Sequence, residues 1–211
     1  MASPAVEILR QQLRDKFPQA HALRADAEPV VPQGKPFRAE AFPVGAISEV
    51  VPAGPVAVLT LLVAGLLGDP RETSPHPELV LVDGADSFDP GSFSGTACSK
   101  LLWVRCRSAV EMIKAADLVV HDGNVPFVLL DATGLVRRDL SALPASAWWR
   151  LKQTIERTGG RLVVMASFPL VPCAALRFSL SAGLSLRDFD SPRAELLDRL
   201  QVQSEGLRRA T

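Results

Sequence analysis

Short apolar runs alternate along the chain with segments whose apolar residues recur at helical spacing. The runs predict five strands, at residues 46–51, 79–82, 101–104, 126–130 and 161–166. The segments between them predict helices at residues 56–67, from Ser108 to about Leu118, and at residues 145–157. In the second of these helices we expect Val110, Ile113 and Leu118 to face inward. Strands that alternate with helices predict a doubly wound α/β fold, with a mainly parallel sheet covered on both faces.

A separate amphipathic helix is predicted at the N-terminus. Ser3 and Pro4 suit a helix cap and a first helical position, and Pro18 ends the helix. Its apolar side is formed by Val6, Leu9, Leu13 and Phe17. Residues 19–38 contain several prolines and no periodicity, which predicts a linker arm. A helix on such an arm either folds back on its own domain or docks on a neighbouring molecule, and the sequence leaves both interpretations open.

The C-terminal part is predicted to contain a hairpin and a last helix. Alternating residues at 176–180 and 184–186 predict two antiparallel edge strands. Residues 190–192 then cap a helix whose apolar side is formed by Leu196, Leu197, Leu200 and Leu207. This side either packs on the sheet or binds a partner. We therefore divide the chain into an N-terminal helix and linker arm (1–38), a core domain (39–188) and a C-terminal helix (189–211).

Composition narrows the class of protein. Lys+Arg and Asp+Glu each number 23, and a protein that coats nucleic acid usually carries a basic excess, so we expect no strong direct DNA binding. The cysteines, Cys98, Cys106 and Cys173, form no Cys-x-x-Cys pair, which argues against a zinc site and favours a cytoplasmic protein. The apolar stretch at residues 56–67 is too short for a membrane span, which needs about 20 residues.

The predicted central strand ends in an acid. The apolar run at residues 126–130 is followed by Asp131 and then by small residues. Ligands of open α/β sheets bind at the carboxyl ends of the strands, and nucleotide-hydrolysing enzymes hold magnesium there with an aspartate. A lone acid at a strand end also commonly caps a neighbouring helix or loop. Asp131 therefore predicts either the remainder of a magnesium site or a local cap.

The segment between the first strand and the first core helix lacks the chemistry of a phosphate-binding loop. That loop requires G-x-x-x-x-G-K-S/T, because glycines let the backbone surround the phosphates and lysine neutralises their charge. Here Pro52 and Ala57 stand at the glycine positions, Val58 at the lysine and Leu59 at the hydroxyl. Pro55 also removes a backbone N–H donor. We expect no nucleotide hydrolysis at this loop.

Three stretches together resemble the core of RecA-type recombinases. They are FPVGAISEVVPAG (residues 42–54), LVDGADSFDP (residues 81–90) and VLLDATGL (residues 128–135). The resemblance implies a RecA-like core. It places Ala85 where the family has the glutamate that activates water, and Asp86 is expected to point elsewhere. It therefore implies a degenerate nucleotide site with no catalytic residue, no cofactor and no metal.

Two families resemble RecA cores without a working nucleotide site, namely ImuA-like accessory proteins and SulA-like inhibitors of cell division. The opening helix, the arm and the predicted last helix favour the ImuA-like family. This resemblance implies a non-catalytic scaffold of a damage-induced (SOS) mutagenic translesion synthesis complex. Its partners would be an ImuB-like relative of Y-family polymerases and a C-family DNA polymerase, with self-association or RecA contact through the arm. The SulA-like alternative would bind FtsZ.

Two further pairs of residues have a structural and a functional interpretation. Trp148 and Trp149 would point about 100° apart on a helix, so we expect one in the core and consider the other a candidate interface anchor. His121 and Asp122 resemble a catalytic dyad, but we interpret them as a solvated turn in the loop before the central strand.

Overall fold

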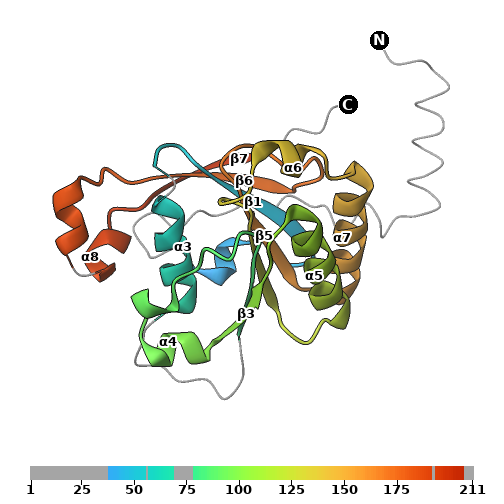
Figure 1. Ribbon diagram of the computed structural model, residues 1–211, viewed down its shortest axis with the longest axis horizontal. Helices are drawn as coiled ribbons and strands as arrows, with labels where there is room; N and C mark the ends of the chain where they lie inside the picture. The colour runs from blue at the N-terminus through green and yellow to red at the C-terminus, as the bar shows by residue number, and fades with distance from the viewer. Residues whose placement is uncertain (1–37, 56, 69–77, 192, 207–211) are drawn as a thin grey trace, which may run out of the picture. The chain divides into compact units, whose positions relative to one another are not determined.

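The computed structural model of the chain describes residues 38–55, 57–68, 78–191 and 193–206 (Figure 1). The predicted N-terminal helix, with Val6, Leu9, Leu13 and Phe17, lies outside the described residues, as do nearly all of the arm and Leu207. No described helix combines the length and the hydropathy that crossing a lipid bilayer requires.

The described residues build a seven-stranded sheet in the order β3-β2-β4-β5-β1-β6-β7. The strands are β1 (Ala46–Pro52), β2 (Leu79–Asp83), β3 (Leu101–Arg105), β4 (Phe127–Asp131), β5 (Arg161–Met165), β6 (Leu176–Ser181) and β7 (Gln201–Gly206). Every neighbouring pair is parallel except β6 and β7. The five strands predicted from apolar runs are confirmed, and the fold is a doubly wound, mainly parallel α/β fold of the RecA-like kind.

Helices cover both faces of this sheet (Figure 1). One face carries α5 (Ala109–Asp122) and α7 (Ala145–Thr158), and the other carries α3 (Val58–Leu67), α4 (Gly95–Ser99) and the turn η1 (Ala39–Ala41). The shorter elements are η2 (Pro90–Ser92), α6 (Arg137–Ser141), η3 (Leu186–Asp190) and α8 (Arg193–Leu197).

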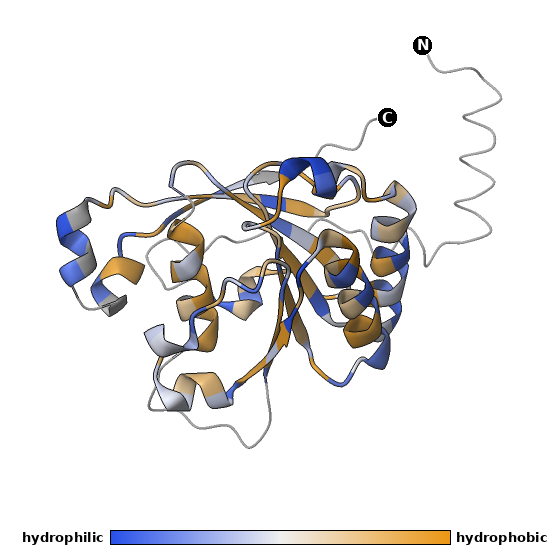
Figure 2. Cartoon of the chain, in the orientation of Figure 1, coloured by the Kyte–Doolittle hydropathy of each residue, from blue (hydrophilic) through white to orange (hydrophobic). Residues whose placement is uncertain are grey.

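The central strand β4 contributes to the cores on both faces. Val128 and Leu130 enter the core under α5 and α7, whereas Phe127 and Leu129 enter the core under α3. A strand buried on both faces has a continuous apolar sequence, which is the pattern that predicted its central place. Figure 2 shows the central strands as largely hydrophobic.

The orientation of α5 differs from the prediction. Ile113 is buried as expected, but Val110 and Leu118 are 55% and 73% exposed. The side that faces the sheet consists instead of Ala109, Met112, Ile113, Ala116 and Val120. These positions follow the 3.6-residue helical period, and their alanines allow close approach to the sheet. The helix also extends to Asp122, with Gly123 in a left-handed cap, so His121 and Asp122 form its last turn rather than a loop.

The predicted C-terminal hairpin is wrong in its pairing. The segment at residues 184–186 forms no strand and leads directly into η3. β6 pairs with β1 in parallel and with β7 in antiparallel orientation. The backbone groups of β6 that face away from β1 need hydrogen-bond partners, and β7 supplies them.

The predicted last helix is also wrong beyond Leu197. The helix α8 has five residues, and the chain continues through a turn into β7. Leu196 is buried, and Leu200 packs against the apolar cluster under α3. Leu197 is partly exposed. The continuous helical stripe that the sequence predicted for these leucines is therefore not formed, and their role in partner binding stays a prediction.

Candidate functional site

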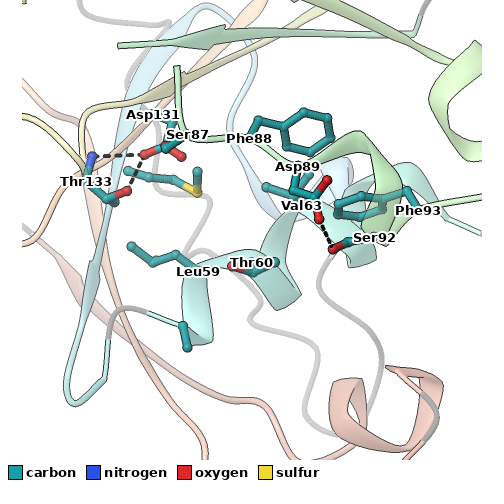
Figure 3. A pocket seen from close by; sticks show the side chains of 12 residues that line it. Leu59, Thr60, Val63, Ser87, Phe88, Asp89, Ser92, Phe93, Asp131 and Thr133 are labelled. Carbon is teal, nitrogen blue, oxygen red and sulfur yellow. Dashed lines mark hydrogen bonds between the residues drawn. The ribbon is translucent and has the colours of Figure 1, made fainter. Parts of the chain in front are cut away.

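A pocket of about 310 Å³ lies at the carboxyl ends of the central strands (Figure 3). Asp131 at the end of β4 stands level with Asp83 of β2 and Met165 of β5 in the strand register. The lining comes from the start of α3, from the loop after β2, and from the ends of β4 and β5. It consists of Ala57, Leu59, Thr60, Val63, Ser87, Phe88, Asp89, Ser92, Phe93, Asp131, Thr133 and Met165. This is the edge where a RecA-like fold would place a nucleotide.

The described residues that connect β1 to α3 and begin that helix contribute to packing and offer no phosphate-binding side chain. Pro52 belongs to β1 itself, and the backbone N–H of Ala53 donates to the carbonyl of Leu180 on β6 at 2.7 Å. Ala57 precedes α3 without a side-chain cap. Val58 and Leu59 are 1% and 2% exposed and belong to the core under α3. The positions of the lysine and the hydroxyl are therefore occupied by core residues.

A neighbouring loop lies close to Ala85, the residue that the resemblance places at the activating glutamate. A Cβ placed on Gly134 would lie 2.6 Å from the Cβ of Ala85. Gly84, beside Ala85, donates its N–H to the carbonyl of Asp131 at 2.9 Å. The loops after β2 and β4 thus lie directly against each other, and Ala85 is not among the residues that line the pocket.

Asp86 points away from the pocket, as the sequence predicted. Its carboxylate accepts hydrogen bonds from Arg105 Nε at 2.6 Å and Arg105 Nη2 at 2.7 Å. The hydrogen bonds and the charge of Arg105 lower the pKa of Asp86. The Arg105 guanidinium also lies 4.9 Å from the ring centre of Trp103. Asp86 is therefore committed to a bidentate ion pair at the edge of the sheet.

Asp83 is a structural acid that the sequence analysis missed. It is fully buried, and it accepts from the backbone N–H of Phe88 at 2.7 Å and from Trp103 Nε1 at 3.2 Å. It also accepts weaker hydrogen bonds from Ala85 N at 3.3 Å and Ser87 Oγ at 3.4 Å. Its signal was available, because Asp83 ends an apolar strand just as Asp131 does. Asp83 holds the loop that carries Phe88 to the pocket.

Asp131 forms the local cap, which is one of the two roles that the sequence left open, and the magnesium role stays a prediction. Its Oδ1 accepts from the backbone N–H of Thr133 at 2.9 Å and from Thr133 Oγ1 at 2.5 Å, which is the local cap. Its Oδ2 accepts no hydrogen bond from any described residue, and the side chain lines the pocket. Burial raises the pKa of Asp131, the hydrogen bonds from Thr133 oppose this rise, and the charge of Asp83 adds to it.

The described residues contain no group of three or more His, Cys, Asp or Glu side chains that could hold a metal ion. No residue that lines the pocket is basic. A triphosphate in this pocket would therefore meet two carboxylates and no cation among the described lining residues, which is unfavourable.

The connection from β5 to β6, where a recombinase has a long DNA-binding loop, is short and fixed. Buried Glu49 of β1, which the sequence analysis also missed, accepts from the backbone N–H groups of Leu170 and Val171 and from Arg177 Nε at 2.7 Å. Arg137 stacks on the Phe168 ring at 4.4 Å. These contacts give the loop a structural role.

The tryptophan pair is divided between core and surface, as predicted. Trp148 is 2% exposed and lies in the core under α7, whereas Trp149 is 49% exposed. Lys152 Nζ lies 5.3 Å from the centre of the Trp149 ring. Trp149 thus stays a candidate interface anchor.

The chain matches no model of a known protein family, and no curated protein matches it significantly.

Proposed function

We propose that this protein is a non-catalytic, RecA-like scaffold of a damage-induced mutagenic translesion synthesis complex. The observation that carries the proposal is a RecA-like sheet with packing residues at the edge where a nucleotide would bind. Val58 and Leu59 enter the core, and Ala85 lies against Gly134. A protein that keeps this fold without this chemistry acts by presenting surfaces.

The partners in this proposal are an ImuB-like relative of Y-family polymerases and, through it, a C-family DNA polymerase. The described region leaves large apolar side chains exposed on two neighbouring helices, namely Val110 and Leu118 on α5 and Trp149 on α7. An ion pair between Arg150 Nε and Asp117 Oδ1 at 3.0 Å joins the same helices. Exposed aromatic and aliphatic residues on a rigid base suit a protein interface.

The test is a pull-down with the full chain from damage-treated cells, with partners identified by mass spectrometry. We expect a Y-family polymerase relative to be recovered, and we expect Trp149→Ala to reduce its recovery. Leu102→Ala is the matched control, because Leu102 is 45% exposed but lies on β3 at the edge of the sheet. Robust ATP turnover by the unmodified protein would contradict the proposal.

A division inhibitor that binds FtsZ is the second candidate. The predicted last helix was one of the features that favoured the ImuA-like family, and it is replaced by α8 and β7. The remaining features, the opening helix and the arm, lie outside the described residues. Expression of the chain separates the two functions, because an inhibitor of division would produce filamentous cells and a polymerase scaffold would not.

A further inference from the structure

The pocket at the strand ends has a chemistry opposite to that of a nucleotide site. Its lining carries the carboxylates of Asp89 and Asp131, and four hydroxyl side chains add further oxygen atoms. These hydroxyls belong to Thr60, Ser87, Ser92 and Thr133. Oxygen acceptors in this number attract a positively charged hydrogen-bond donor.

Both carboxylates are held in fixed positions. Asp89 Oδ1 accepts from Gly91 N at 2.9 Å, and Asp89 Oδ2 accepts from Ser92 Oγ at 2.7 Å. Asp131 is fixed through Oδ1 by Thr133, and this leaves Oδ2 for a ligand (Figure 3). Burial raises the pKa of Asp131 in spite of the hydrogen bonds from Thr133. A cation beside Oδ2 would compensate for the solvation that the carboxylate has lost.

The remaining walls are apolar and are also built into the fold. Phe88 and Phe93 stack with their ring centres 5.2 Å apart. The backbone N–H of Phe88 donates to the carboxylate of Asp83, which holds Phe88 in place. Leu59 and Val63 of α3 supply aliphatic surface. A volume of about 310 Å³ lies at the lower end of the range for small-ligand sites. Such walls suit a short alkyl stem, and aromatic rings also attract cations.

We propose that this pocket binds an ammonium or guanidinium group on a short apolar stem, with Asp131 Oδ2 as the ion-pair acceptor. Two sources share this chemistry, a free alkylamine and a lysine or arginine side chain presented by a protein partner. The inference rests on the pocket alone and holds whether or not the translesion assignment is correct.

The test is a titration of the full-length protein labelled with 13C in its methionine methyl groups. Met165 lines the pocket, whereas Met112 belongs to α5 and is buried in the core on the other face of the sheet, so its signal serves as an internal reference. We expect n-butylguanidinium or n-butylammonium to shift the Met165 signal and to leave Met112 nearly unchanged. Neutral 1-pentanol tests the apolar stem without the charge.

Variants assign the binding to the carboxylate. We expect Asp131→Asn to weaken binding of the cation by about tenfold or more, because a charge-assisted hydrogen bond is lost. Asp139→Asn is the matched control, since Asp139 is an exposed acid on α6 outside the pocket, and we expect less than about a twofold change. If Asp131→Asn does not fold, Asp89→Asn provides the same comparison with a second lining acid.

The outcomes are distinct. Binding of n-butylammonium without binding of the peptide acetyl-Gly-Arg-Gly-amide indicates a free amine, and binding of the peptide alone indicates a partner side chain. Either result supports the inference. Equal binding of 1-pentanol, tighter binding of magnesium-ATP, or a Met165 shift with magnesium chloride alone would overturn it. The same is true if Asp131→Asn binds the cations as well as the unmodified protein does.

Discussion

The loops that follow β1 and β2 depart from an active nucleotide site in different ways. After β1, the expected side chains are missing, but the backbone keeps space around it: a Cβ on Gly54 would meet nothing within 4 Å. After β2, the space itself is missing, because Gly84 and Ala85 lie against the loop after β4. A single substitution could restore a side chain in the first loop, but no single substitution reopens the second. The two loops should therefore respond differently to mutation.

The largest expected effect is that of Asp83→Ala in the second loop. The change leaves Phe88 N and Trp103 Nε1, which are partly buried, without their acceptor. We expect a loss of about 4 kcal/mol in the free energy of unfolding, because each buried unsatisfied donor costs about 1–3 kcal/mol. Urea denaturation measures the loss. Asp83→Asn keeps one acceptor oxygen and should be milder, and an Ala variant as stable as the unmodified protein would refute the role of Asp83.

Gly84→Ala compared with Gly54→Ala tests the difference between the loops directly. A Cβ on Gly84 would lie 2.7 Å from Leu135 Cδ1, 2.8 Å from Met112 Sδ and 2.9 Å from the carbonyl oxygen of Asp131. Since a backbone atom is among these neighbours, we expect a loss of about 2–3 kcal/mol. Gly54→Ala should be neutral, or stabilising by up to about 1 kcal/mol, because the unfolded chain loses entropy. Thermal and urea unfolding give both values, and equal effects would remove the distinction between the loops.

Val58→Lys tests whether a cation in the first loop is enough for ATP hydrolysis. Val58 is 1% exposed and belongs to the core under α3, so a lysine there must bury its stem and carry its charge out of the core. We expect a loss of about 2 kcal/mol in the free energy of unfolding and no ATP hydrolysis. Val58→Met is the control for side-chain length without charge. Measurable turnover in the lysine variant would show that the close approach of Gly134 to Ala85 does not prevent catalysis.

Much of the fold followed from the sequence because the core strands are buried on both faces. The apolar run of β4 has one interpretation, whereas α5 carries apolar residues on both sides, and Val110 and Leu118 could not be told from the buried Met112 by type alone. β7 forms because it pairs with β6, which lies earlier in the chain. The helical spacing of Leu196, Leu197 and Leu200 does not predict this pairing. The degenerate phosphate loop was readable from residue types. The position of Asp83 at the end of an apolar strand was also readable, but its structural role was not, because that role depends on donors such as Trp103 from another strand.

The smallest expected effect is on the pH dependence of stability, because the pKa values of Asp86 and Asp131 are shifted in opposite directions. The pKa of Asp86 is lowered by Arg105, so its contribution to stability is present above the ordinary carboxyl pKa of about 3.9 and is lost as the pH falls through the lower folded value. The pKa of Asp131 is raised by burial, so the folded state takes up this proton before the unfolded state does. Stability therefore gains from Asp131 as the pH falls from neutral through its raised pKa.

Carboxyl 13C NMR measures both groups in one titration. We expect Asp131 to titrate at a higher pH than Asp86, and Arg105→Gln to bring the pKa of Asp86 back toward its ordinary value without moving that of Asp131, which Arg105 does not contact. Asp131→Asn should remove the stability gain at low pH, since the amide cannot titrate but can still accept from Thr133. If Asp131 titrated below Asp86, its carboxylate would be better stabilised than the pocket geometry implies. A cation from elsewhere in the chain would then have to occupy the place that the described lining leaves to a ligand.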